Sequence, residues 1–202
     1  MDFKNNYPKI LLLLYIIIWI IAAINPNHRS VWVDENILPV AFVFLLIITF
    51  KKFRLSNLSY SFIFIFLILH AIGGHYSYSE VPLFDFIKQQ YSLSRNHYDR
   101  LVHFLFGVLF FLPIHEVITR IFKIQKGWRS FVLSAFMILS LKAGFEIIEY
   151  SYTALRNNSL TVTNYLGEQG DALDSIKDIT LGFIGALISL SIISIKNIRK
   201  SQ

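Results

Sequence analysis

The sequence contains no cysteine and few charged residues, and each absence restricts what the protein can be. Without cysteine there is no disulfide, no thiolate ligand for zinc or an iron–sulfur cluster, and no thiol nucleophile. A bound metal ion would therefore need His, Asp, Glu or water as ligands. Lys, Arg, Asp and Glu make up 16% of the 202 residues, against about 25% in soluble globular domains. This composition excludes a disordered chain and an ordinary soluble enzyme.

The sequence is instead rich in long apolar runs, with 54% hydrophobic residues and 19 phenylalanines. Six apolar segments cover residues 8–24, 37–50, 58–72, 101–114, 131–145 and 176–195. Several fall short of the ~20 residues that a helix needs to cross ~30 Å of hydrocarbon, but polar neighbours inside a bundle can complete a span. The segment 37–50 is the weakest and is also compatible with a re-entrant segment. We predict an all-α, polytopic helical membrane bundle of about six transmembrane helices, forming a single integral-membrane domain over residues 1–202.

The distribution of basic residues predicts the orientation of this bundle. Twelve of the 19 Lys and Arg residues fall at one end, in the two termini and the second and fourth loops: Lys4, Lys9, Lys51, Lys52, Arg54, Arg120, Lys123, Lys126, Arg129, Lys196, Arg199 and Lys200. By the positive-inside rule that end is cytoplasmic. We therefore expect a multi-pass cell-membrane protein with both termini in the cytoplasm, in which the basic loops touch membrane lipids rather than nucleic acid.

Two segments between the spans have distinctive compositions. Residues 81–93 mix apolar and charged side chains and predict an amphipathic helix in the outer interface. Residues 152–166 are polar and predict an external loop. His28 and His115 lie away from the other ionisable residues, and we interpret them as surface residues.

Ionisable side chains inside membrane spans are energetically expensive, so each is a functional candidate. At the start of the fourth span, Asp99 and His103 are four residues apart and share a helix face, with Arg100 beside them. At the end of the fifth span, Glu146 and Glu149 form an i, i+3 pair on one face.

The sixth span begins with a third acidic group. Asp171, Asp174 and Asp178 form one stripe at helical offsets that runs into the membrane. Gly182 and Gly185 continue the stripe, and small residues allow this helix to approach a neighbour closely. The predicted topology places all three groups at the external end, where we expect the three helices to meet.

Two interpretations of this cluster remain open. In the first, a divalent metal ion of unknown identity relieves the repulsion among the carboxylates, with a ligand set drawn from His103, Glu146, Asp171, Asp174 and Asp178. In the second, the same residues form salt bridges with Arg100, Lys142 and Lys177 that only hold the helices together.

Further polar residues lie near the same end and are candidates for substrate binding. His75 and Tyr76 follow the third span, and His97 precedes the fourth. A histidine at a helix end is also a common packing residue, and this interpretation stays open for His75.

Four motifs carry a resemblance to a known family: HYSYSEVP at 75–82, LSRNHYDRLVHFLFG at 93–107, FEIIEY at 145–150 and LGEQGDALDSIKDITLGFIGA at 166–186. In this order they resemble the YjdF-type family of bacterial inner-membrane proteins, whose function is unknown. More distantly, they are similar to VanZ-like proteins of the cell envelope. The resemblance implies a helical membrane bundle and marks as site residues Asp99, Arg100, His103, Glu146, Glu149, Gln169, Asp171, Asp174 and Asp178.

The functional hypothesis is a polar site near the external face that binds a divalent metal and acts on a small or lipid-linked envelope molecule. If the protein is an enzyme, Glu149 and Asp99 are the candidate acid–base residues and Arg100 steadies an anionic group. Gln169 joins His75, Tyr76 and His97 as a candidate for substrate binding. The alternatives are a small-solute or ion transporter that uses the carboxylates, and a non-catalytic membrane scaffold. Substrate and oligomeric state do not follow from the sequence.

Overall fold

The computed structural model describes residues 3–156 and 169–200, and every regular element within them is helical. The helices are α1 (Phe3–Ala22), α2 (Arg29–Thr49), α3 (Asn57–His75), α4 (Pro82–Gln90), α5 (Tyr98–Arg120), α6 (Trp128–Arg156) and α8 (Asp174–Lys200). Five of them, α2, α3, α5, α6 and α8, contain a stretch long and apolar enough to cross a membrane, and the apolar part of α1, Asn6–Ala22, is shorter. The predicted all-α membrane bundle is confirmed.

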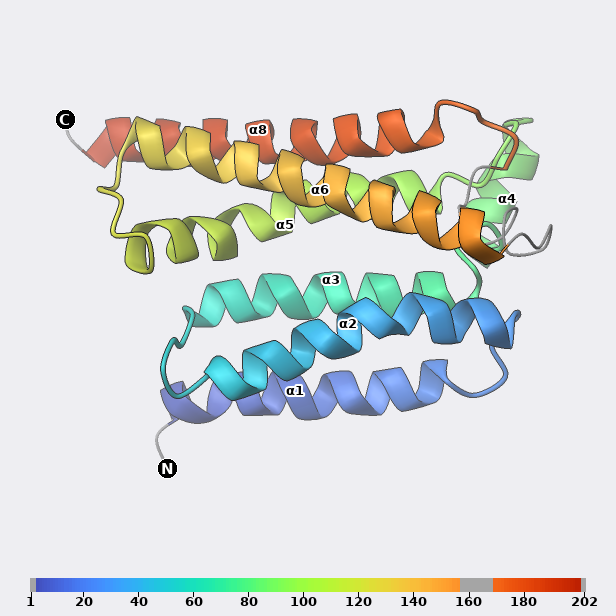
Figure 1. The fold of residues 1–202 in the computed structure, drawn as a ribbon, viewed down its shortest axis with the longest axis horizontal. Coiled ribbons are helices and arrows are strands. Elements are labelled where there is room, and N and C mark those ends of the chain that lie inside the picture. Colours follow the sequence, from blue (N-terminus) through green and yellow to red (C-terminus); the bar gives the residue numbers. More distant parts are fainter. Residues whose placement is uncertain (1–2, 157–168, 201–202) are drawn as a thin grey trace.

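The helices pack as two groups (Figure 1). In one group α1 and α2 pack against α3, and in the other α5, α6 and α8 pack against one another. The main contact between the groups is between α3 and α5, and α2 also reaches α6 through the hydrogen bond from Tyr152 to Asp34. Both termini lie at the left end of the bundle in Figure 1, and α4 lies at the right end. The starts of α5 and α8 and the end of α6 therefore share the α4 end, while the basic loops share the other.

The outer surface of the bundle carries large apolar side chains, as contact with lipid requires. Leu13, Ile21, Phe44 and Ile147 are apolar and more than half exposed, whereas Phe111 and other buried residues fill the core. In lipid, every backbone amide and carbonyl needs a partner within the protein, and a helix supplies these partners along its own length. The long apolar runs of this sequence consequently form helices rather than strands.

The contact between α5 and α8 is unusually close because glycines line it. A Cβ atom on Gly107 would lie 1.9 Å from the carbonyl oxygen of Gly182, and one on Gly185 would lie 2.3 Å from the carbonyl oxygen of Phe104. Neither backbone can move away without separating the two helices. The prediction that the glycines after Asp178 permit close helix packing is confirmed.

Several helix boundaries differ from the sequence prediction. Helix α2 starts at Arg29, eight residues before the predicted segment, and runs as one continuous helix rather than a re-entrant segment. Helix α6 continues to Arg156, so Glu146 and Glu149 lie within it, and the predicted loop 152–166 is helical up to Arg156. Residues 157–166 of that loop lie outside the described residues. The polar side chains near these boundaries are buried against other helices, which the hydropathy of one segment does not reveal.

Two further expectations concern the segment 81–93 and His115. The amphipathic segment 81–93 contains α4, whose residues are all at least partly exposed, so the predicted helix is present. The interpretation of His115 as a surface residue is wrong: its side chain is buried, and its Nδ1 lies 3.2 Å from the Ser134 hydroxyl of α6. A hydrogen-bonded position between two helices satisfies this histidine, which is the usual condition for burying a polar ring.

Candidate functional site

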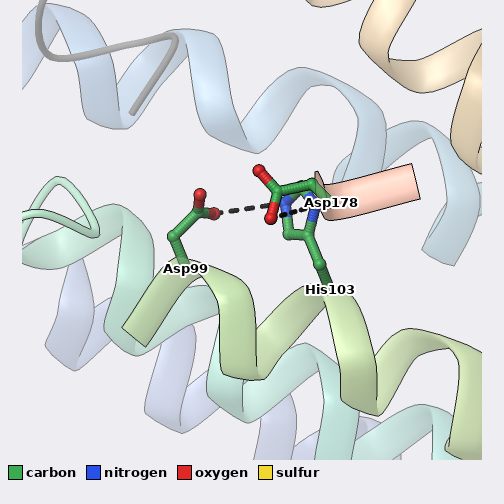
Figure 2. A group of neighbouring side chains, drawn as sticks. All are labelled: Asp99, His103 and Asp178. Atoms are coloured by element: carbon green, nitrogen blue, oxygen red, sulfur yellow. Dashed lines mark ion pairs between the residues drawn. The ribbon is translucent and has the colours of Figure 1, made fainter. Parts of the chain in front are cut away.

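Three ionisable side chains converge between the starts of α5 and α8 (Figure 2). Asp99 and His103 stand one turn apart on α5, with Asp99 Oδ1 3.1 Å from His103 Nε2, and Asp178 Oδ1 on α8 lies 3.7 Å from His103 Nδ1. Each residue offers one ligand atom, and these three atoms lie within 4.8 Å of one another. We call Asp99, His103 and Asp178 the acidic triad.

The third helix contributes Lys142 and Glu146 of α6 to the same point. Lys142 Nζ lies 2.8 Å from His103 Nδ1 and donates to Glu146 Oε1 at 3.0 Å. Glu146 Oε1 is also 3.5 Å from His103 Nδ1. The predicted meeting of the fourth, fifth and sixth spans is therefore confirmed.

The local charge around His103 is unbalanced. Three carboxylates, those of Asp99, Glu146 and Asp178, approach the ring, and Lys142 supplies one ammonium. Asp178 is only 2% exposed, and its Oδ1 has no hydrogen-bond partner among the described residues. Burying a carboxylate without a full set of partners is costly. This position therefore favours a bound cation or a retained proton.

Glu149 lies one turn beyond Glu146 on α6 and is also buried. It is within electrostatic range of Glu146, Asp99 and Lys142. With Glu35 of α2 as a third acid within range, it faces three acids and one base, so it adds to the negative excess of the same region. A carboxylate in this setting is suited to accept or release a proton.

A second group of charges lies beside the acidic triad, towards the α4 end. Arg95 forms an ion pair with Asp174 and lies 3.6 Å from Asp99, and Arg100 forms an ion pair with Asp171. Lys177 Nζ donates to Asp171 Oδ2 at 2.6 Å. The prediction of one helical stripe is wrong for Asp171, because α8 begins at Asp174 and Asp171 lies in the turn before it. Asp171 and Asp174 are paired with guanidinium groups, and Asp178 faces the histidine. The roles predicted for these residues stay predictions.

The hydrogen bonds of Asp171 shift its protonation equilibrium. Hydrogen bonds from Lys177, then from the Leu173 amide and Arg100, hold the pKa of Asp171 at about 2, below its ordinary value, because they stabilise the carboxylate form. Asp171 is therefore a carboxylate over the whole physiological range.

Two other predicted residues lie next to this charged group. Gln169 binds the backbone of Asn96: its Oε1 accepts from the amide at 2.9 Å and its Nε2 donates to the carbonyl at 3.1 Å. His97, the residue before α5, is half-buried, and burial together with the nearby Arg100 and Arg95 lowers the pKa of its imidazole. Gln169 therefore positions the residues that precede α5, and His97 is neutral at neutral pH.

His75 and Tyr76 are not part of the acidic triad or its neighbours. His75 Nδ1 lies 2.9 Å from the carbonyl oxygen of Ala22 at the end of α1, and its ring packs edge-on against Tyr76. These contacts agree with the packing interpretation that the sequence left open. Their predicted role in substrate binding stays a prediction.

The sequence interpretation missed a buried network on the other half of the bundle. His70 of α3 is bound by the Tyr78 hydroxyl at Nδ1, and its Nε2 lies 2.9 Å from the carbonyl oxygen of Glu35 on α2. Tyr78 reaches His70 because Gly73 leaves room for its ring, which would lie 2.4 Å from a Cβ atom there. Burial raises the pKa of the Tyr78 phenol, so it remains a hydrogen-bond donor.

Arg95 is the other important residue that the sequence interpretation missed. It lies before α5, outside every apolar segment, yet it is only 2% exposed and contacts acids from both α5 and α8. No helix periodicity signals it, because α5 begins at Tyr98 and Arg95 lies in the loop before it.

Comparisons with known proteins agree with the fold. A family model described as "Predicted membrane protein (DUF2238)" matches residues 7–199. The chain is 30% identical over 174 residues to the protein named "Inner membrane protein YjdF" of Escherichia coli (strain K12), a match that covers 86% of this chain and 82% of that protein. No solved structure matches the chain. The resemblance to the YjdF-type family is confirmed, and the more distant likeness to VanZ-like proteins stays a prediction.

Proposed function

Because the chain belongs to the DUF2238 family of membrane proteins, we propose that it is an inner-membrane protein with a divalent-cation site at its acidic triad. The site acts on, or binds, a small or lipid-linked molecule of the cell envelope. Positive-inside topology puts the triad at the external end, with both termini in the cytoplasm.

The observation that carries this proposal is the buried Asp178 carboxylate beside Asp99 and His103. Three ligand groups from two helices lie within 4.8 Å of one another, and Asp178 Oδ1 lacks a hydrogen-bond partner among the described residues. Crowded like charges repel at this depth, and a divalent cation removes that repulsion. Imidazole and carboxylate ligands suit Zn²⁺ or Mn²⁺, whereas thiolate-dependent ions are excluded by the lack of cysteine.

The neighbouring residues have separate roles in this proposal. A bound cation would supply a Lewis acid and a water with pKa lowered towards about 7. Glu149, which is buried near other acids, would serve as the proton acceptor of such a site. Arg100 binds an anionic group of the substrate, since its Nε has no hydrogen-bond partner among the described residues although its Nη2 holds Asp171.

The test compares two aspartates one turn apart on α8. Purified protein is analysed for bound metals, and melting curves in detergent are recorded with chelator and with Mg²⁺, Mn²⁺ or Zn²⁺. We expect one of these ions to raise the melting temperature of the parent, by mass action on the folded state. Asp178→Asn should remove this response, while Asp174→Asn, which breaks the pair with Arg95, should lower the melting temperature but keep the response.

Measurements on the unsubstituted protein alone can contradict the proposal. If it carries no metal and its melting temperature ignores both chelator and added ions, the acidic triad is not a cation site. A response that Asp178→Asn leaves intact would place the cation elsewhere.

One observation favours a second function, a proton-coupled or ion-coupled transporter. Lys142, His103 and Asp99 form a continuous chain of buried polar contacts across two helices, from Glu146 to the start of α5. Such chains carry protons in membrane transport proteins. Reconstituted vesicles with an internal pH dye would show a proton flux that Glu146→Gln abolishes, and a parent without flux would rule this function out.

A further inference from the structure

A cavity of about 230 Å³ opens between α1, α2 and α3, at the end of the bundle opposite to the acidic triad. Its wall is mostly apolar and includes Leu12, Val43, Ile47, Ile63 and Leu67. Pockets for drug-sized ligands usually enclose roughly 300–1,000 Å³. This cavity is smaller than that range and partly open, so it has room for one alkyl chain rather than for a bulky headgroup.

The cavity has a cation at its rim. Lys9 of α1 is exposed and belongs to the cavity lining, next to the buried Pro8. Phe50, which also lines the cavity, is followed directly by Lys51 and Lys52, both exposed. One lysine therefore lines the apolar cavity and two more directly follow a lining residue, and this charge selects a ligand whose polar end is anionic.

A buried hydroxyl provides a second, independent observation. Tyr15 lines the cavity and is 5% exposed, and its hydroxyl has no hydrogen-bond partner among the described residues. A buried hydroxyl without a partner costs free energy. Its presence in the wall indicates that the helices around this cavity are not packed as a closed, fully satisfied core.

We infer that this cavity is a binding site for one anionic phospholipid, with an acyl chain between α1, α2 and α3 and the phosphate at Lys9, Lys51 and Lys52. The apolar wall accepts the chain, and the lysines accept the headgroup. All three lysines belong to the basic end of the bundle, which the positive-inside rule places in the anionic cytoplasmic leaflet. This inference does not depend on the proposed metal site, because the cavity is lined by α1, α2 and α3, whereas the acidic triad lies on α5 and α8.

The experiment uses delipidated full-length protein and defined lipids. Native mass spectrometry and melting curves compare phosphatidylglycerol with phosphatidylethanolamine of the same acyl chains. We expect one phosphatidylglycerol to be retained and to stabilise the parent more than phosphatidylethanolamine. Because a basic residue near a membrane surface contributes about 1 kcal/mol, Lys9→Gln should weaken phosphatidylglycerol binding about fivefold.

Two further variants separate a site from general lipid contact. Lys126→Gln removes an exposed lysine of the same basic end that does not line the cavity, and it should bind like the parent. Val43→Phe fills the cavity and should remove the retained lipid. Equal binding of the two lipids, or equal effects of Lys9→Gln and Lys126→Gln, would overturn the inference. Since Lys9 is exposed, Lys9→Gln tests it even if Val43→Phe does not fold.

Discussion

The Nζ atom of Lys142 lies 2.8 Å from Nδ1 of His103, so an ammonium group already stands against the ring that completes the acidic triad. An ammonium only donates, so Nδ1 is the acceptor and a neutral His103 carries its proton on Nε2, facing Asp99. The Lys142 ammonium and a divalent cation would be stabilised by the same carboxylates beside His103, so each opposes the presence of the other. Replacing Lys142 is therefore a direct test of the proposed cation site.

Replacing Lys142 with glutamine should have two opposite effects. In chelator, Lys142→Gln should be less stable by about 3–5 kcal/mol, because Glu146 loses its buried partner. With added metal, it should gain more stability than the parent, since the competing charge is gone. Melting curves with and without metal measure both effects. Lys177→Gln is the control, since its 44% exposed side chain should cost at most about 1 kcal/mol. An unchanged metal response in Lys142→Gln would show that no cation binds beside His103.

Arg95 should be essential for the packing of α8 against the start of α5. Arg95→Gln removes the shorter of the two guanidinium contacts of the buried Asp174 and leaves only Arg100 at 3.4 Å, so we expect a loss of about 3 kcal/mol in the free energy of unfolding. Arg95→Lys should not restore it, because an ammonium cannot span two carboxylates as a planar guanidinium does. A double-mutant cycle with Asp174→Asn measures the coupling. Purely additive losses would mean that the pair contributes nothing.

The close approach of α5 and α8 should tolerate no side chain at Gly107. Gly107→Ala places a methyl group against the backbone of Gly182, and we expect a loss of at least about 1–3 kcal/mol. Gly144→Ala on α6 meets nothing within 4 Å and should be neutral, or more stable by up to about 1 kcal/mol. Denaturation of the two variants in detergent compares them directly. Equal stabilities would disprove the tight contact.

Asp171 should make the stability depend on acid pH. Its pKa of about 2 lies below the value near 3.9 of an unfolded chain. A lowered carboxyl pKa stabilises the fold above the unfolded value, and this contribution disappears as the pH falls through the folded value. The difference in melting temperature between the parent and Asp171→Asn should be constant above about pH 5 and vanish near pH 2. A difference that persists at pH 2 would show that the carboxylate charge is not its source.

The orientation of the bundle can be measured with single cysteines, because the chain has none of its own. Ser94 lies at the α4 end and Lys126 in the loop between α5 and α6, and both are exposed. In intact cells, an impermeant thiol reagent should label Ser94→Cys but not Lys126→Cys. Permeabilised cells should show labelling of both. The reverse pattern would place the acidic triad at the cytoplasmic face.

Much of the site was predictable from helix periodicity. Asp99 and His103 were expected to share a face, and they lie one turn apart with their side chains in contact. The meeting of Glu146 with them followed from the cost of leaving ionisable groups unpartnered in a membrane. Arg95 was missed because it lies in a loop, where no periodic pattern indicates which side chains become buried.

The long apolar runs were enough to imply a helical membrane bundle, because a backbone in lipid must form its hydrogen bonds within the protein and apolar runs of this length do so as helices. Which partner each aspartate contacts depended on the tertiary packing of the helices. Asp171, Asp174 and Asp178 look equivalent as one stripe, yet the first two meet Arg100 and Arg95 and the third meets His103. No local pattern encodes this difference, because each partner comes from another part of the chain. The glycine contact between α5 and α8 brings these partners within reach.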